Sequence, residues 1–312
     1  MAEPRTGWDP GVLPDATGRV FVVTGGNAGI GYFISEQLAS AGATVVLASR
    51  SEAKAHLAMQ AIGARVPGAS LRYLPLDLSR LPQVRATADG LGALDRIDGL
   101  VLNAASLVQK RRSTTQDGHE LVLGTNHYGN AQLVAVALPH LARTPGARVV
   151  TMGSVAQRAG RIDVDDLEHT RGSYRGLRTY GTAKLAQMLV ALELDRRLRT
   201  AGRTTVSLIA HPGGAVDGLT PDRPPAFVHT ARQRRGAAAM RLFVQGKDRA
   251  AWPAVRAALD PDARGGQLWG PGSATGRRPP RLQRLRGALT DHELAAALWE
   301  RTERELGRTL EV

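Results

Sequence analysis

A glycine-rich turn between a predicted strand and a predicted helix constrains this chain most. The run Thr24-Gly25-Gly26-Asn27-Ala28-Gly29-Ile30-Gly31 follows the apolar residues 20–23. Apolar residues then recur at helical spacing, at Ile30, Phe33, Ile34 and Leu38. Glycines in such a turn let the backbone approach a pyrophosphate, which the amino end of the helix attracts. The run therefore predicts a dinucleotide-binding βα unit.

Strand-like and helix-like segments alternate over the first two thirds of the chain. Predicted strands cover residues 20–23, 44–49, 71–76, 99–102, 148–152 and 205–210, with a short last strand at 267–269. Predicted helices cover residues 52–65, 118–141 and 180–199. This alternation is typical of βαβ units and a parallel sheet. We therefore expect one α/β domain over residues 1–312, a doubly wound Rossmann-like sheet of about seven strands flanked by helices.

The last third of the chain departs from this rhythm. Beyond a core of about residues 18–213, prolines 221, 224 and 225 interrupt the pattern, and a basic, partly apolar stretch follows. We expect residues 214–262 to form a substrate lid. Residues 263–312 should supply a strand, a loop over 271–281 and a terminal helix over 290–306, with Thr290 as its N-cap and Glu293 completing a capping box.

Composition excludes several classes of protein. The chain has no cysteine, which rules out disulfides and thiolate chemistry, and it shows neither a signal peptide nor an apolar span, so we expect a soluble, cytoplasmic protein. Its net charge is +13, but only four of its 41 basic residues are lysine, which indicates a compositional bias toward arginine. The cluster of arginines over 277–286 has no interleaved aromatic residue, so we expect no nucleic-acid partner. We also expect no metal site.

Further motifs follow the predicted strands or lie in the predicted helices. They are Asp77-Leu78, Asn103-Ala104-Ala105, Asn126 in Thr-Asn-His-Tyr-Gly, Ser154 in Met-Gly-Ser-Val, Tyr180-Gly-Thr-Ala-Lys184, and His211-Pro212-Gly213. With the Thr24–Gly31 run they resemble, in order over residues 19–213, the short-chain dehydrogenase/reductase family. The 160–167 insertion and Leu-Ala-Gln after Lys184 resemble its retinol-dehydrogenase-like branch, which includes protochlorophyllide reductases. We expect a bacterial member of this branch.

The residue types of the Tyr180–Lys184 pair suit acid–base chemistry. The two side chains share a face at i and i+4 on one helix. An unperturbed tyrosine has a pKa near ~10, and we expect the Lys184 ammonium to lower it. Ser154 should orient a carbonyl and stabilise its developing charge. The resemblance further implies that Asn126 binds a water that relays protons to Lys184, so the expected catalytic set is Asn126, Ser154, Tyr180 and Lys184.

The expected cofactor is NADP(H). The resemblance places it on Thr24, Gly25, Asn27, Gly29, Ile30, Gly31, Ser49, Arg50, Asp77, Leu78, Asn103, Ala104, Tyr180, Lys184, Pro212 and Gly213. An acid at the end of the second strand would bind the ribose hydroxyls of NAD. Here Ser49 and Arg50 stand there instead, and an arginine pairs with a 2′-phosphate.

The expected activity is reduction of a small-molecule ketone or aldehyde, or oxidation of the alcohol, with a homodimer or tetramer as the assembly. C=C reduction and a non-catalytic NADP(H) sensor remain the alternatives. Two departures from the family bear on the cofactor: Ala105 replaces a glycine, and Asp217 stands where many members have a threonine, unless Thr220 takes that place. The basic lid could also serve an acidic or carrier-bound substrate, or be plain solvated surface.

Overall fold

The centre of the protein is one eight-stranded sheet. The computed structural model describes residues 8–312. The strands lie in the order β3-β2-β1-β4-β5-β6-β7-β8, and only β8 runs antiparallel, against β7. Their bounds are β1 (Val20–Thr24), β2 (Thr44–Ser49), β3 (Leu71–Pro75), β4 (Gly99–Leu102), β5 (Arg148–Met152), β6 (Val206–Ala210), β7 (Leu268–Gly270) and β8 (Arg281–Gln283). The predicted Rossmann-like α/β fold is confirmed.

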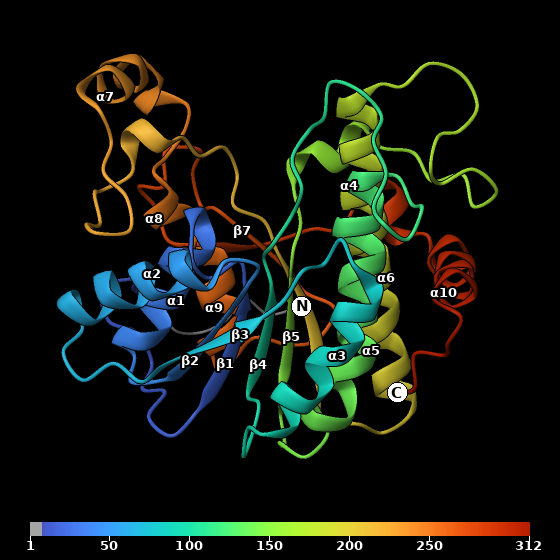
Figure 1. Cartoon of the computed structure of the whole chain (residues 1–312), viewed down its shortest axis with the longest axis horizontal. Helices are drawn as coiled ribbons and strands as arrows, with labels where there is room; N and C mark the ends of the chain where they lie inside the picture. The colour runs from blue at the N-terminus through green and yellow to red at the C-terminus, as the bar shows by residue number, and fades with distance from the viewer. Residues whose placement is uncertain (1–7) are drawn as a thin grey trace.

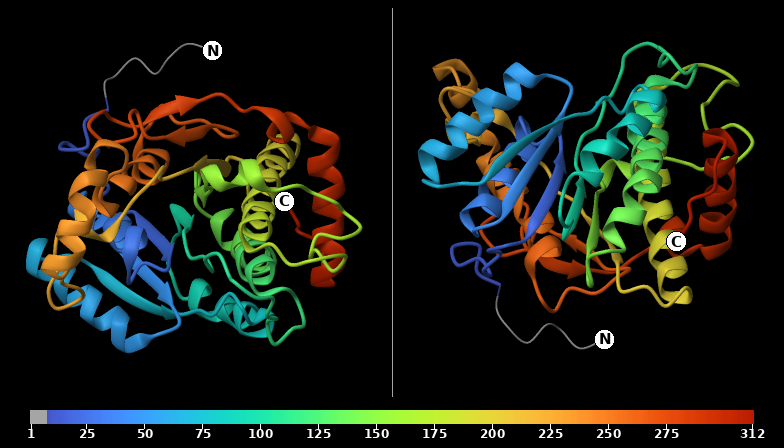
Figure 2. Two further views of the ribbon diagram at one scale, coloured as in Figure 1. Left: turned by 90° about the horizontal axis from the view of Figure 1, so that it is seen from above. Right: turned by 60° about the horizontal axis from the view of Figure 1, so that its bottom comes forward.

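Helices cover both faces of this sheet (Figure 1). Their bounds are α1 (Gly29–Ser40), α2 (Glu52–Arg65), α3 (Leu81–Gly92), α4 (Leu121–Leu123), α5 (Gly129–Leu141), α6 (Gly176–Thr200), α7 (Ala231–Ala238), α8 (Lys247–Ala250), α9 (Trp252–Leu259) and α10 (His292–Leu306). Helices α1, α2 and α9 pack on one face and α3, α5 and α6 on the other, with α10 outside α6 (Figure 2). Within residues 8–312, no helix has both the length and the apolar character needed to cross a membrane.

Alternation along the strands divides the core into two layers. In β1, Phe21 and Val23 join the cluster under α1, α2 and α9, whereas Val22 joins the cluster under α3, α5 and α6. All three side chains are fully buried. Each such burial stabilises the fold by about 1.5–3 kcal/mol. Strands buried on both faces are what a parallel sheet requires, and they hold the loops at its carboxyl edge in fixed positions.

Several element bounds differ from the sequence expectation. Helix α6 begins at Gly176, one turn before Tyr180. The predicted helix over 118–141 is a short α4, a π-helical turn over Gly124–Tyr128 and then α5. Such π turns are frequent at functional sites because they displace one backbone carbonyl from the regular ladder. The turn contains Asn126.

Three local expectations need correction. Helix α3 was not predicted, because its glycines at 90 and 92 hide the helical spacing of its buried residues Leu81, Val84 and Leu91. The loop expected over 271–281 ends in strand β8, the eighth strand, at Arg281. The N-cap of α10 is Asp291, whose carboxylate accepts the N–H of Leu294, and not Thr290.

The expected lid over 214–262 is too long. Helix α9 belongs to the core, with Ala254, Val255 and Ala257 fully buried against the sheet. Small residues bring the helix close to the strands. Its one cation, Arg256, is buried, where the carboxylate of Asp260 pairs with its charge and the carbonyl of Pro280 accepts one of its N–H groups. The segment that leaves the core is therefore shorter, about residues 214–246.

Candidate active site

The glycine-rich turn lies between β1 and α1, at the carboxyl edge of the sheet. Gly29 has a φ of +58°, in the left-handed region. A Cβ at Gly31 would lie 2.2 Å from the carbonyl oxygen of Gly25, so only glycine fits there. The N-cap of α1 is Ala28, which offers no side-chain oxygen to the first N–H groups. Those groups are free to receive an anion, as a pyrophosphate-binding turn requires.

Two residues join this turn to the loop that follows β4. The Thr24 hydroxyl accepts the N–H groups of Asn103 and Ala104, both at 2.9 Å. The Asn103 amide returns a hydrogen bond of 2.9 Å to the carbonyl of Thr24. These paired bonds fix the loop after β4 against the glycine-rich turn. Ala105 follows in the same loop and is half-buried.

The end of β2 carries Ser49 and Arg50 in place of an acid, as the sequence predicts. Ser49 is buried, and its hydroxyl has no hydrogen-bond partner within residues 8–312. Arg50 is exposed beside it, with no acidic side chain at this strand end. Asp77 follows β3 and accepts the N–H and hydroxyl of Ser79 at 3.0 and 2.7 Å, and Leu78 is buried. An orphaned buried hydroxyl next to an exposed arginine suits a bound sugar phosphate.

A cavity of about 330 Å³ adjoins the glycine-rich turn. Asn27 and Gly29 line one side, Lys54 of α2 lies near them, and Lys247 and Asp217 come from the other side. Sequence reasoning missed both lysines. The available signal was that they are two of only four lysines in an arginine-dominated chain. Lys247 is paired with Asp217, so Asp217 has a salt-bridge partner in this cavity.

The segment after β6 is tied down where it leaves the sheet. Gln245 donates to the carbonyl of Pro212 at 2.6 Å, and its backbone pairs with Ala215. Gly213 lies in the left-handed region, at φ +68°. Thr220 is buried, where its hydroxyl donates to the carbonyl of Val216 and accepts the N–H of Lys247. Thr220 therefore holds the base of the lid in this arrangement.

Ser154 and Tyr180 meet at the edge of the sheet where β5 ends. Burial of the phenol raises the pKa of Tyr180, and a hydrogen bond with the Ser154 side chain opposes that rise. The expectation that Lys184 lowers this pKa is therefore wrong for this arrangement, since the cost of burying a phenolate is the larger effect. Tyr180 is held as the neutral phenol, which is the form that donates a proton.

Lys184 lies one turn further along α6 and is almost fully buried. Its ammonium donates to the carbonyl of Met152 at 2.8 Å and to Oε1 of Gln187 at 3.0 Å. Burial lowers the pKa of Lys184 to about 8. The ammonium is anchored toward the end of β5.

Asn126 is fully buried in the π-helical turn. Its side-chain oxygen accepts the N–H of Ser106 at 2.6 Å, and its amide donates to the carbonyl of Ser106 at 2.9 Å. The side chain therefore positions the loop after β4. The main-chain carbonyl of Asn126 accepts the amide of Asn130 at 3.0 Å.

A small cavity lies beside Asn130 and Gln187, the residues that contact Asn126 and Lys184. It has a volume of about 20 Å³, room for one water, and Asn130, Gln187 and His127 line it. Asn130 Oδ1 and Gln187 Nε2 are buried without partners in the part of the chain that the structure describes. One water between them would complete a chain from Lys184 through Gln187 and Asn130 to Asn126.

Comparison with known proteins places this geometry in a family. The family model described as short chain dehydrogenase matches residues 19–166. Polyprenol dehydrogenase from Mus musculus is 35% identical over 299 residues, which is 95% of this chain and 86% of that protein. The chain belongs to the short-chain dehydrogenase/reductase family.

Other members of the short-chain dehydrogenase/reductase family narrow the placement to the retinol-dehydrogenase-like branch. Retinol dehydrogenase 12 from Homo sapiens is 37% identical over 196 residues, 63% of this chain and 61% of that protein. A crystal structure of an uncharacterised protein from Mycobacterium paratuberculosis matches with a TM-score of 0.76 and 31% identity, covering 98% of this chain and 100% of that one. The Pseudomonas aeruginosa RhlG/NADP complex matches with a TM-score of 0.62 and 25% identity, covering 84% and 98%.

Proposed function

We propose that this short-chain dehydrogenase/reductase reduces a ketone or aldehyde, or oxidises the alcohol, with NADP(H) and with Tyr180 as the acid and base. The observation that carries the proposal is the arrangement at the end of β5, where Ser154 follows the strand, Lys184 donates to the carbonyl of Met152 at 2.8 Å, and Tyr180 lies one turn before Lys184 on α6. Two O–H donors side by side suit a single carbonyl oxygen, which has two lone pairs. Reduction of the carbonyl itself requires a proton at that oxygen, which the neutral phenol of Tyr180 would donate.

The residues around the glycine-rich turn fit a dinucleotide phosphate. The uncapped amino end of α1 would receive the pyrophosphate, and Ser49 has a buried hydroxyl without a partner. Arg50 and Lys54 would pair with a 2′-phosphate, at a strand end that carries no acid to repel it. Asp77, Leu78, Asn103 and Ala104 would border the adenine. These features support NADP(H) over NAD(H).

When bound, the nicotinamide supplies or accepts the hydride. Tyr180, kept protonated by burial, donates its proton to the carbonyl oxygen in the direction of reduction. Ser154 orients that oxygen and stabilises its negative charge. Lys184 holds the nicotinamide ribose hydroxyls, with its ammonium directed by Met152 and Gln187. Asn126 holds the loop after β4 through Ser106, and Asn130 fixes the main-chain carbonyl of Asn126.

The exposed part of the site supports an apolar substrate. Val155 follows Ser154, and Leu177 lies one helical turn before Tyr180, both exposed. The named activities of similar proteins, on polyprenol and on retinol, concern apolar alcohols. We therefore infer a lipophilic alcohol or carbonyl compound as the substrate class.

A screen of aldehydes and ketones of increasing chain length tests the proposal. Consumption of NADPH is followed by its absorbance, and NADH is run in parallel. We expect turnover with NADPH that improves with apolar chain length. Turnover confined to enone C=C bonds, or tight NADPH binding with no turnover of any substrate, would overturn it.

A further inference from the structure

Exposed apolar side chains gather on the lid lobe, residues 217–243. Met240, Leu242 and Phe243 are all exposed, and Phe243 keeps 74% of its surface in solvent. They follow α7, whose amino end is fixed by a capping box between Thr230 and Gln233. A large phenylalanine at the tip of a structured lobe costs solubility, so a surface that covers it is the natural explanation.

A second such group lies on the rim opposite the lid lobe, residues 105–112 and 171–178. Leu107, Val108 and Leu177 are exposed there, with Leu107 at 70%. Val108 reaches the amino end of α6, since a Cβ at Gly176 would lie 3.2 Å from its Cγ1. The three side chains therefore share one small area, one turn from Tyr180.

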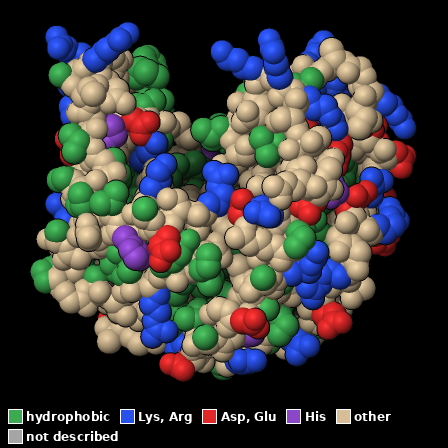
Figure 3. All heavy atoms as spheres, viewed as in Figure 1, with side chains coloured by type: hydrophobic (Ala, Val, Ile, Leu, Met, Phe, Trp, Pro, Cys, Tyr) green, Lys and Arg blue, Asp and Glu red, His purple; other side chains and the backbone are tan. Residues whose placement is uncertain are grey.

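Unpaired basic side chains surround both groups. On the lid lobe they are Arg232, Arg235 and Arg241, and on the rim Lys110, Arg111, Arg175 and Arg178. Each is exposed, and none takes part in a salt bridge within the described residues, 8–312. The space-filling view shows Lys and Arg at the tips of two raised lobes, with a hollow between them (Figure 3).

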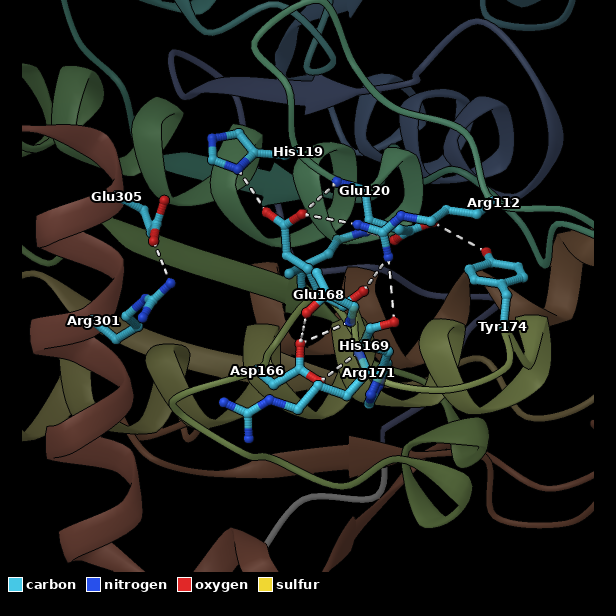
Figure 4. A network of polar contacts seen from close by, with 12 residues as sticks. Arg112, His119, Glu120, Asp166, Glu168, His169, Arg171, Tyr174, Arg301 and Glu305 are labelled. Carbon is cyan, nitrogen blue, oxygen red and sulfur yellow. Dashed lines mark hydrogen bonds and ion pairs between the residues drawn. The ribbon is translucent and has the colours of Figure 1, made fainter.

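The acids nearest to these lobes are already engaged. Asp222 pairs with Arg234 at 2.7 Å, and Asp217 pairs with Lys247. On the rim, Glu168 accepts from the N–H of Glu120 at 3.0 Å and contacts His119 at 2.8 Å (Figure 4). Arg112 of the rim also donates to the main-chain carbonyl and to the carboxylate of Glu168. Both tips are thus firmly held and carry uncompensated positive charge.

We propose that the two lobes dock together on an anionic lipid bilayer. Such a surface offers phosphate groups to the arginines and hydrocarbon to the exposed side chains of Phe243, Leu242 and Leu107. A single protein partner would have to fill the hollow to reach both tips, whereas a bilayer contacts both without entering it. The hollow between the two lobes would then open onto the membrane. The entry of a lipophilic substrate from the bilayer rests on the proposed function, whereas the docking itself does not.

Co-sedimentation with vesicles tests the docking without any activity measurement. The probes are phosphatidylcholine vesicles, alone or with about one third phosphatidylglycerol. We expect binding to the anionic vesicles that weakens with added salt. Leu242→Asp/Phe243→Asp, Leu107→Asp and Arg235→Glu/Arg241→Glu should each weaken it, the arginine pair by about tenfold or more.

Two matched controls lie away from the lobes. Val12→Asp changes an equally exposed apolar residue before β1, and Arg143→Glu an exposed cation after α5. Both should bind vesicles as the unchanged chain does, and thermal melting should show all variants folded. Equal loss in the controls, or no binding to anionic vesicles, overturns the proposal. If the arginine variant loses vesicle binding and the apolar variants keep it, the proposal is also overturned. That result would indicate a basic surface that binds an acidic protein.

An activity measurement separates this inference from the proposed function. A long-chain aldehyde in anionic vesicles is compared with a short soluble aldehyde. We expect the Leu242→Asp/Phe243→Asp variant to lose kcat/KM for the first substrate only. Absence of turnover with both substrates, beside normal vesicle binding, would refute the proposed function and leave the docking standing.

Discussion

The ammonium of Lys184 lies 3.0 Å from Oε1 of Gln187, on the same buried face of α6. This contact makes Gln187 a positioning residue, because it directs the ammonium and stabilises its charged form. Its own Nε2 points to the small cavity shared with Asn130. Asn130 in turn bonds the carbonyl of Asn126. Gln187 on Lys184 and Asn130 on Asn126 therefore line the same small cavity.

Substitutions at Gln187 should shift the pH profile in opposite directions. Gln187→Leu removes an acceptor from the ammonium, so the pKa of Lys184 falls below about 8 and the alkaline limb of kcat/KM moves to lower pH. Gln187→Glu adds a negative charge and should move that limb to higher pH. A purely structural role would lower activity in both variants without opposite shifts.

Burial of Lys184 should also appear in stability. Its pKa is about 8 in the fold and ordinarily 10.5, so between these values the unfolded chain binds the additional proton. Stability from this group therefore rises with pH across that window. Relative to Lys184→Met, the unchanged protein should gain about 2–3 kcal/mol of unfolding free energy between pH 7 and 10. Urea unfolding measures this, and Lys110→Met, at an exposed lysine, should show no such trend.

Cofactor preference should follow the charge at the end of β2. Arg50→Asp removes a partner for the 2′-phosphate and supplies an acceptor for ribose hydroxyls. We expect the ratio of kcat/KM for NADPH over NADH to fall by about tenfold or more, since one charge-assisted bond contributes about 1.5–3 kcal/mol. Arg72→Asp, at an exposed arginine on β3, is the matched control. An unchanged ratio would make Arg50 a surface residue only.

Ligands should protect the lid. Residues 214–246 leave the sheet at the edge where the cofactor is expected, and Asp217 and the adjoining Lys247 line the cavity beside the glycine-rich turn. NADPH with substrate should therefore slow proteolysis at the arginines of this segment much more than in the loop near Arg278. Equal cleavage of both segments with and without ligands would leave a plain surface insertion as the better description.

The sequence predicted the parallel sheet and its loops well, because strands buried on both faces leave unbroken apolar runs. Strands β2, β4 and β5 have the predicted bounds. Helix α9 was placed in the lid because it follows a mixed apolar and basic stretch, and the sequence does not show that Arg256 is buried against Asp260. The pKa of Tyr180 depends on burial of the phenol and on Ser154, which the spacing of Tyr180 and Lys184 alone does not encode.

Contacts between distant segments were also beyond the sequence. Lys54 and Lys247 meet at one cavity although they lie far apart in the chain. Helix α10 packs on α6, with Leu298 and Trp299 fully buried, and so covers part of the surface through which a homodimer or tetramer was expected to form. The predicted assembly stays a prediction.

Proton donation by Tyr180 is the central claim, and Tyr180→Phe tests it most directly. The change removes one hydroxyl and keeps the buried ring, so NADPH binding, measured by its fluorescence, should stay nearly intact. Carbonyl reduction should fall by about 10²–10⁴-fold, the usual contribution of a general acid. Tyr174→Phe, which removes a hydroxyl bound to Glu120 on the rim, should retain turnover. Reduction by Tyr180→Phe at the rate of the unchanged protein would contradict the account, because the proton would then come from another group.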